Sequence, residues 1–112
     1  MVKSIITNFE NISAFSGVPK ECDHHLIFGR GLRELADADG LWIPLLNREH
    51  NLSSIGTIYQ IHGNPAAEKL SKMLGQMAWE RNFVIEKYSL PFDDVSTEAR
   101  EAFRDRYGNS YL

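Results

Sequence analysis

The clearest alternation of apolar and polar positions along the chain is helical. From Pro65 onward, apolar residues recur every three to four positions, the spacing of one helix face: Ala66, Leu70, Met73, Leu74, Met77 and Ala78. Asn64 is a favoured N-cap residue, Pro65 is a favoured first helical residue, and Pro91 limits the helix at its other end. The pattern therefore predicts a long helix from Pro65 to before Pro91, with Met73 and Met77 filling the core.

A second helix is predicted from about Ser96 to Tyr107. Ser96 would cap it, Glu98 lies in its first turn, and Gly108 follows as a C-terminal stop. The apolar face of this helix carries Val95, Ala99, Ala102, Phe103 and Tyr107.

The first 20 residues predict a strand and a loop. Residues 2–7 are β-prone, with two isoleucines at their centre. Residues 8–20 contain Asn, Ser, Gly17 and Pro19, which are typical of a loop.

Residues 24–28 and 41–46 predict an antiparallel ribbon. The first is a short strand, and the second is apolar but contains Pro44, which favours an edge strand or an irregular extended segment. Between them, residues 31–39 predict a short helix that Gly40 ends. Together with the two later helices, these elements predict an α+β fold.

Composition narrows the class of protein. The chain has 112 residues, 43% hydrophobic and 24% charged, which favours one globular domain and excludes a disordered or fibrous chain. No apolar run approaches the length of a membrane span, and the first residues lack the apolar core of a secretory signal. The single cysteine, Cys22, excludes a disulfide within the chain, so we expect a reducing, cytoplasmic location. The net charge of −3 means that any contact with nucleic acid must use a local basic surface.

The four histidines, His24, His25, His50 and His62, lie between positions 24 and 62. Neighbouring side chains of a strand point to opposite faces, so His24 and His25 cannot both reach one point from a regular strand. Three imidazoles with open positions beside them are typical of a catalytic metal site. The alternative is that the histidines are structural or solvated, and that His50 and His62 lie on loops and bind nothing.

Four ordered segments carry a resemblance to a known family: His24-His25-Leu26-Ile27-Phe28-Gly29, Asp39-Gly40-Leu41-Trp42-Ile43-Pro44-Leu45, Glu49-His50-Asn51 and Ile61-His62-Gly63-Asn64-Pro65. Over about residues 13–75, the chain resembles the phage- and prophage-associated branch of the HNH endonucleases, also called His-Me finger or ββα-metal endonucleases. Residues 103–112 also look like tails found in that branch.

The resemblance implies a β-hairpin followed by a helix, with one divalent metal ion held between them. It implies His24, His50 and His62 as metal ligands and His25 as the general base that activates water. Asn64 would be the helix cap rather than a ligand. The whole chain, 1–112, would be one HNH-like domain, with an N-terminal strand and loop (1–23), a ββα-metal core (24–82) and a C-terminal helical extension (83–112).

Two departures from the family pattern stand out. Many relatives bind a structural zinc through two Cys-x-x-Cys knuckles, but this chain has Ser13, Ser16, Leu46 and Glu49 at the matching positions. Because serine and leucine cannot replace thiolates on zinc, we expect hydrophobic packing or a partner chain to stabilise the fold instead. The middle asparagine of the family name, which orients the base in relatives, has only Asp39 near its place.

The ligands and partners follow from this interpretation. The cofactor is one divalent ion (Zn, Ni, Co, Mn or Mg), and imidazole-rich ligation favours a transition metal. The partner is the phosphate backbone of DNA in a bacterial or phage-infected cell, with no membrane. Candidate phosphate contacts are Arg30, Arg33, Arg48, Lys69 and Lys72, whose alternative role is ordinary solvated surface.

Two other functions remain open at this point. One is a catalytically degenerate HNH-like module that binds metal or DNA, or serves as an interaction module, in a phage or prophage. The other is a small helical binding protein whose histidines are incidental. The apolar residues Trp42, Trp79, Tyr111 and Leu112 are compatible with either a monomer or a homodimer.

Overall fold

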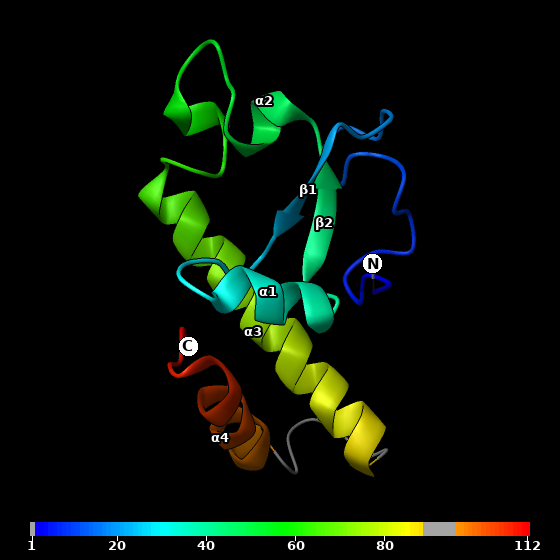
Figure 1. Ribbon diagram of the computed structural model, residues 1–112, viewed down its shortest axis with the longest axis vertical. Helices are drawn as coiled ribbons and strands as arrows, with labels where there is room; N and C mark the ends of the chain where they lie inside the picture. Colours follow the sequence, from blue (N-terminus) through cyan, green and yellow to red (C-terminus); the bar gives the residue numbers. More distant parts are fainter. Residues whose placement is uncertain (1, 89–95) are drawn as a thin grey trace.

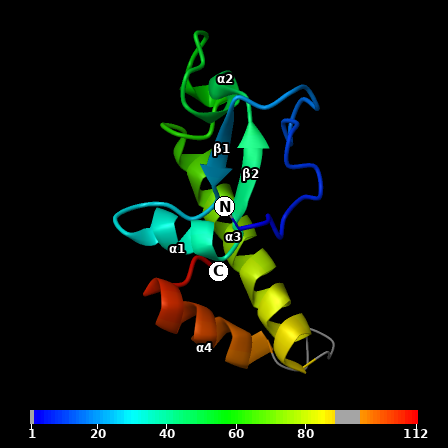
Figure 2. The ribbon, with the colours of Figure 1, turned by 45° about the vertical axis from the view of Figure 1, so that its right-hand side comes forward.

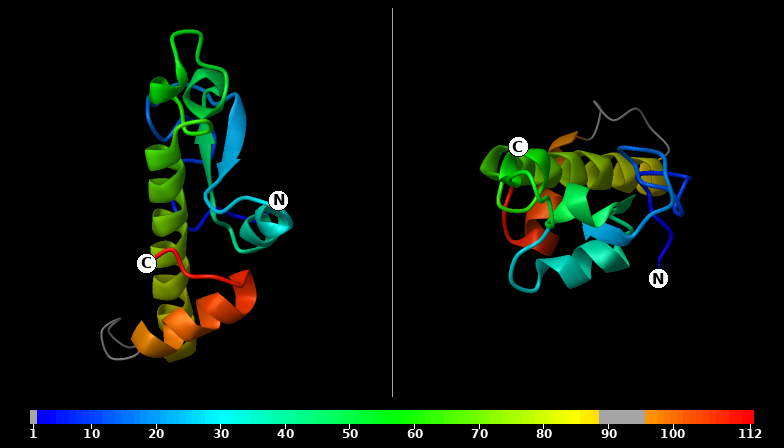
Figure 3. Two further views of the ribbon diagram at one scale, coloured as in Figure 1. Left: turned by 90° about the vertical axis from the view of Figure 1, so that its left-hand side faces the viewer. Right: turned by 90° about the horizontal axis from the view of Figure 1, so that it is seen from above.

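A computed structural model describes residues 2–88 and 96–112 of the chain. The molecule measures 44 × 26 × 23 Å, and helix α3 (Pro65–Tyr88) runs along most of its longest dimension. Most of the remaining chain lies to one side of α3, and the segment that precedes α3 extends beyond its first turn (Figure 1, Figure 3). Within the described residues, no helix has the length and apolar character needed to cross a bilayer.

The predicted antiparallel ribbon is confirmed, and with it the α+β class. Strand β1 (Cys22–His25) pairs with β2 (Trp42–Leu45), and helix α1 (Leu32–Ala38) connects them. Asp23 faces Pro44 in this register. The two strands form a sheet of their own, so each has a free edge where the missing N–H of a proline is tolerated. Strand β1 is displaced toward the N-terminus from the predicted range 24–28.

The predicted strand at residues 2–7 is wrong. This described segment forms no strand, although the Ile5 amide donates a hydrogen bond to the Gly40 carbonyl at 2.9 Å. The Ser4 hydroxyl accepts from the amides of Ile6 and Thr7 and donates to the Trp42 carbonyl. A side chain that accepts hydrogen bonds from nearby backbone amides in this way favours a local turn, which competes with the hydrogen bonds of a strand. The loop predicted for residues 8–20 is present, with one bridge between Ile12 and Pro19.

The bounds of helix α3 agree with the prediction. The Asn64 side-chain oxygen accepts a hydrogen bond from the Ala67 amide at 3.3 Å, as an N-cap does. The predicted buried face is wrong, however, because Leu70, Leu74 and Met77 are 64%, 48% and 57% exposed. The face that is buried carries mostly small and polar residues, with one apolar residue near its end: Ser71, Gly75, Gln76, Glu80 and Val84.

The close approach of the chain after β1 to helix α3 explains why this face of α3 is buried. A Cβ atom at Gly75 would lie 2.8 Å from Cγ1 of Ile27, so the chain after β1 leaves room only for glycine there. The polar residues on this face are paired. Glu80 accepts hydrogen bonds from Arg100 Nε and from the Gln76 amide group. Burial on this face therefore follows mainly from backbone approach and hydrogen bonding, although Ala78 of the predicted face also packs against the core.

Helix α4 (Ser96–Tyr107) has the predicted bounds and crosses α3 next to α1 (Figure 2). Its buried face is the predicted one at Ala99, Phe103 and Tyr107, whereas Val95 and the capping side chain of Ser96 lie outside the described part. Gly108 adopts φ +78° and its amide bonds to the Arg104 carbonyl, which ends the helix. The hydrophobic core joins the hairpin, α1 and α4 through Leu26, Ile27, Ala36, Leu41, Ile43, Leu45, Ile61, Phe103 and Tyr107.

Candidate metal centre

Three histidines that are distant in the sequence meet at one point. His24 belongs to β1, His50 ends helix α2 (Asn47–His50), and His62 precedes α3. Each offers a ring nitrogen, and these three nitrogens lie within 4.8 Å of one another. The ring centroids are 4.6–5.1 Å apart. Side chains this close could hold one metal ion, to which each imidazole nitrogen would bond at about 2.0–2.1 Å.

Backbone hydrogen bonds hold His50 and His62 side by side. Between them, residues 51–61 form a loop that contains the short 3-10 helix η1 (Thr57–Tyr59). The amide of Ile61 donates to the Glu49 carbonyl at 3.0 Å, and the amide of His62 donates to the His50 carbonyl at 2.9 Å. The ends of the loop are therefore joined where the two imidazoles project.

His24 is the buried member of the trio, with 0% exposure. Its Nε2 lies 2.8 Å from the Ser71 hydroxyl, whereas Nδ1 has no hydrogen-bond partner among the described residues. Burial, together with His50 and His62, lowers the pKa of His24 to about 3. The ring is therefore neutral at physiological pH, which is the form that binds metal ions.

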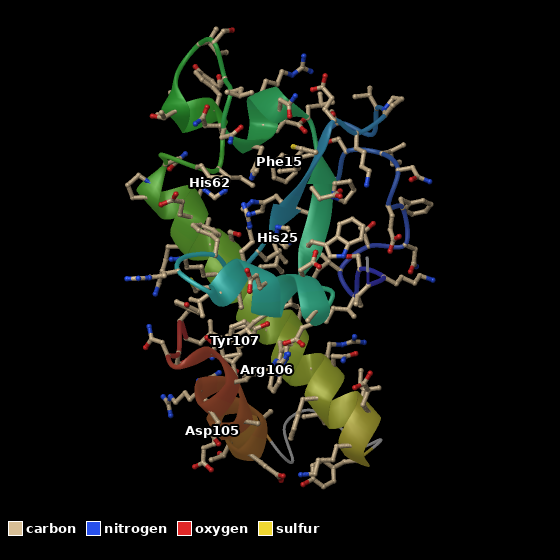
Figure 4. The ribbon with its side chains drawn as sticks, viewed as in Figure 1. Phe15, His25, His62, Asp105, Arg106 and Tyr107 are labelled. Atoms are coloured by element: carbon tan, nitrogen blue, oxygen red, sulfur yellow. The ribbon has the colours of Figure 1, made fainter. Side chains whose placement is uncertain are left out.

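His25 points to a different partner from its neighbour His24. Its Nε2 lies 2.9 Å from Oδ1 of Asp37, which belongs to α1. His25 nevertheless lines the same cleft as His50 and His62, a hollow of about 430 Å³. Figure 4 shows His25 at the end of β1 and His62 just before α3. The end of β1 thus places one imidazole in the trio and the next at the wall of the cleft.

Asp37 is a residue of this site that sequence reasoning missed. The acidic residue noted near the expected asparagine position was Asp39. The structure shows Asp39 bonded instead to Trp79, Arg106 and Tyr107, away from the histidines. The available signal was an acidic residue on the predicted helix between the strands, but this helix carries several.

The five predicted phosphate contacts are spread over the surface. Arg33 lines the cleft, and Lys72 Nζ lies 4.7 Å from the ring centroid of Phe28, which also lines it. The exposed residues Arg30, Arg48 and Lys69 are outside the lining that the described residues form. Two acidic residues, Asp23 and Glu34, also line the cleft, so its charge is mixed.

Ser13, Ser16, Leu46 and Glu49, which stand where relatives have zinc-binding cysteines, lie close together and are joined by hydrogen bonds. The Ser13 hydroxyl donates to Glu49 Oε1 at 2.6 Å, and the Leu46 amide donates to the same oxygen at 2.8 Å. Burial opposes ionisation of Glu49, but hydrogen bonds from Ser13, Leu46 and Ser16 outweigh it and lower the pKa of this carboxyl group. At these positions the structure shows a polar contact within the chain. The expected contribution of hydrophobic packing or a partner chain stays a prediction.

Comparisons with known proteins do not place the chain. No protein-family model matches it, no curated protein matches it, and no solved structure matches it. The resemblance to HNH endonucleases therefore stays a hypothesis, and the case for a function depends on the site itself.

Proposed function

We propose that the protein is a metal-dependent endonuclease of the HNH type that hydrolyses phosphodiester bonds in DNA inside a bacterial or phage-infected cell. In this proposal His24, His50 and His62 hold one divalent cation, and His25 is the general base. The hairpin, the loop that follows and the start of α3 would form the ββα-metal core. The observation that carries the proposal is the convergence of three imidazole nitrogens within 4.8 Å beside a cleft that a fourth histidine lines.

The residues present fit a bound cation. A buried polar atom without a partner is costly, and Nδ1 of His24 is such an atom among the described residues. A cation held by the three imidazoles would satisfy it. Three nitrogen donors suit Zn, Ni, Co or Mn better than Mg, which prefers oxygen ligands. When bound, the cation would act as a Lewis acid on the scissile phosphate and would stabilise charge on the departing oxygen.

His25 and Asp37 supply the proton chemistry. If Nε2–H of His25 donates to the Asp37 carboxylate, Nδ1 carries the lone pair and accepts a proton from water. Asp37 thereby keeps the ring in one tautomer and one orientation. Arg33, on the wall of the same cleft, would attract the phosphate backbone of the substrate.

Nicking of supercoiled plasmid DNA tests the proposal. We expect cleavage by the wild-type protein with at least one of Mn, Ni, Co, Zn or Mg, and loss of cleavage in chelator. The His25→Ala variant should lose activity by ~10²–10⁴-fold and keep its metal affinity, because it removes the base but no ligand. Arg104→Ala is the matched control, since it removes an exposed positive charge from α4 and should leave cleavage unchanged.

A degenerate module that binds metal or DNA is the second candidate. The acidic residues Asp23 and Glu34 in the cleft and the net charge of −3 favour the metal-binding form of this module, because both oppose the approach of a phosphate. Stoichiometric metal binding without cleavage in any of the five metals would contradict the endonuclease and favour this module. Absence of metal binding would contradict the endonuclease and the metal-binding form of this module.

A further inference from the structure

Helix α3 contributes no imidazole to the trio, but two of its side chains contact imidazoles of the trio. Ser71 contacts His24, and Glu68 contacts His62, with a distance of 3.4 Å between Glu68 Oε2 and His62 Nδ1. Glu68 and Ser71 are three residues apart, so they lie on the same face of the helix.

The hydrogen bonds of Ser71 determine which nitrogen of His24 carries the proton. The Ser71 hydroxyl has one hydrogen, and its oxygen lies 2.8 Å from the Leu26 carbonyl oxygen, which can only accept. Ser71 therefore donates to Leu26 and must accept from His24. The proton of the neutral His24 ring then resides on Nε2, and the lone pair resides on the buried Nδ1.

The same reasoning applies to His62 with a weaker contact. A carboxylate only accepts hydrogen bonds, so Glu68 places the proton of neutral His62 on Nδ1 and leaves the lone pair on Nε2. Glu68 also accepts a hydrogen bond from the Gly63 amide at 3.3 Å, which fixes its side chain beside the turn that carries His62.

We propose that Ser71 and Glu68 are positioning residues of the metal centre, which present Nδ1 of His24 and Nε2 of His62 to the cation. This inference depends on the metal site of the proposed function. It assigns opposite ring nitrogens to two ligands and makes the first two turns of α3 the element that aligns them. Partners of this kind fix the tautomer and the ring orientation of metal-binding histidines and typically change metal affinity by 10–100-fold.

Nitrogen-15 NMR of the metal-free protein tests the assignment without any variant. Long-range proton–nitrogen correlations distinguish the two tautomers of each histidine. We expect the proton on Nε2 in His24 and on Nδ1 in His62. A proton on Nδ1 of His24 would overturn the proposal for Ser71, and a proton on Nε2 of His62 would overturn it for Glu68.

Calorimetric titration with Ni²⁺ or Zn²⁺ tests the consequence. Ser71→Ala should weaken binding by about 10–100-fold, and Glu68→Ala should weaken it less, about 10-fold or below, because its contact is longer and partly exposed. Ser54→Ala, an exposed serine in the loop, is the matched control and should bind like wild type.

The outcomes separate this inference from the proposed function. Unchanged affinity in a folded Ser71→Ala protein overturns the role of Ser71 while wild-type metal binding stands. A wild-type protein that binds neither metal overturns the metal centre itself. If Ser71→Ala does not fold, the tautomers of the wild-type protein and the affinity of Glu68→Ala still decide the question, because Glu68 is partly exposed.

Discussion

Two regions of the molecule differ in how completely their buried polar groups are hydrogen-bonded. Below α1, the Asp39 carboxylate accepts four hydrogen bonds, from Trp79 Nε1, from Nε and Nη2 of Arg106, and from the Tyr107 hydroxyl. Figure 4 shows Arg106 and Tyr107 on one side of α1, and His25 and His62 on its other side. There, the buried Nδ1 of His24 has no partner among the described residues. The complete pairing around Asp39 stabilises the fold by itself, whereas the incomplete pairing at His24 is a cost that a ligand would offset.

Aromatic packing strengthens the Asp39 end. The rings of Phe103 and Tyr107 are stacked with centroids 4.5 Å apart, and Trp79 meets Phe103 edge-on at 5.6 Å. Burial and the neighbouring Asp39 carboxylate raise the pKa of Tyr107, so its hydroxyl stays a neutral donor. Asp39 thus joins the end of α1 to α3 and α4 through groups that keep one protonation state.

The largest effect on stability that we predict follows from removal of the Asp39 carboxylate. Asp39→Ala removes the acceptor of all four hydrogen bonds and leaves the Trp79 and Tyr107 donors partly buried. We expect the free energy of unfolding to fall by about 3 kcal/mol, measured by urea denaturation of the metal-free protein. Metal affinity should be unchanged, because none of the hydrogen-bond partners of Asp39 contacts the histidine trio.

Asp105→Ala is the matched control, because Asp105 is an exposed aspartate of α4 next to Arg106. It should change stability by less than about 0.5 kcal/mol. Equal losses in the two variants, or loss of metal binding in Asp39→Ala, would contradict the division of the molecule into an anchoring end and a ligand-binding end.

A smaller effect should come from acid at the histidine end. The pKa of His24 is about 3 in the folded protein and 6.5 as its ordinary value, so the unfolded chain binds a proton between these limits that the folded protein does not. Stability of the metal-free protein is therefore unaffected by His24 above pH 6.5 and falls as the pH drops below it. The loss due to His24 is roughly 2 kcal/mol at pH 5. Burial and His62 also lower the pKa of His50, which adds an effect of the same sign.

Denaturation at pH 7 and pH 5 in chelator measures this effect. The His24→Leu variant, which lacks the titrating ring, should lose less stability over this interval than the wild-type protein. If the two proteins lose the same amount between pH 7 and pH 5, His24 is not buried as a neutral ring and the comparison of the two ends fails.

Two kinds of feature were predictable from the sequence: element boundaries that have strong local signals, and the three histidines that converge. Asn64 and Pro65 mark the start of α3 with two short-range preferences, so that boundary was predictable. The trio was expected from a family resemblance, and the structure brings its nitrogens together. Adjacent positions in the strand also predicted correctly that His24 and His25 would have different partners.

One error and one omission have a common cause, because tertiary contacts decide what a local pattern leaves open. Leu70 and Leu74 follow an apolar period, yet α3 buries its other face, where Gly75 admits Ile27 and where Glu80 meets Arg100. Because that face has few apolar residues, the apolar pattern predicts that it faces solvent. Asp37 and Asp39 differ by two positions, which on a helix directs them to different sides, and only the packed structure shows which one reaches His25.

The smallest effect that we predict lies within the histidine end, at the Ser13–Glu49 hydrogen bond. The Ser13 hydroxyl donates to Glu49 and accepts from the amides of Phe15 and Ser16 at 3.1 and 3.2 Å. Ser13→Ala should lower the free energy of unfolding by about 1 kcal/mol. The loss is smaller than for Asp39→Ala because Glu49 keeps the Leu46 amide as a donor, whereas the Asp39 variant loses every acceptor oxygen. Ser54→Ala should have almost no effect. If Ser13→Ala is as stable as Ser54→Ala, this polar contact does not stabilise α2, and the backbone hydrogen bonds of Glu49 and His50 must hold His50 in place.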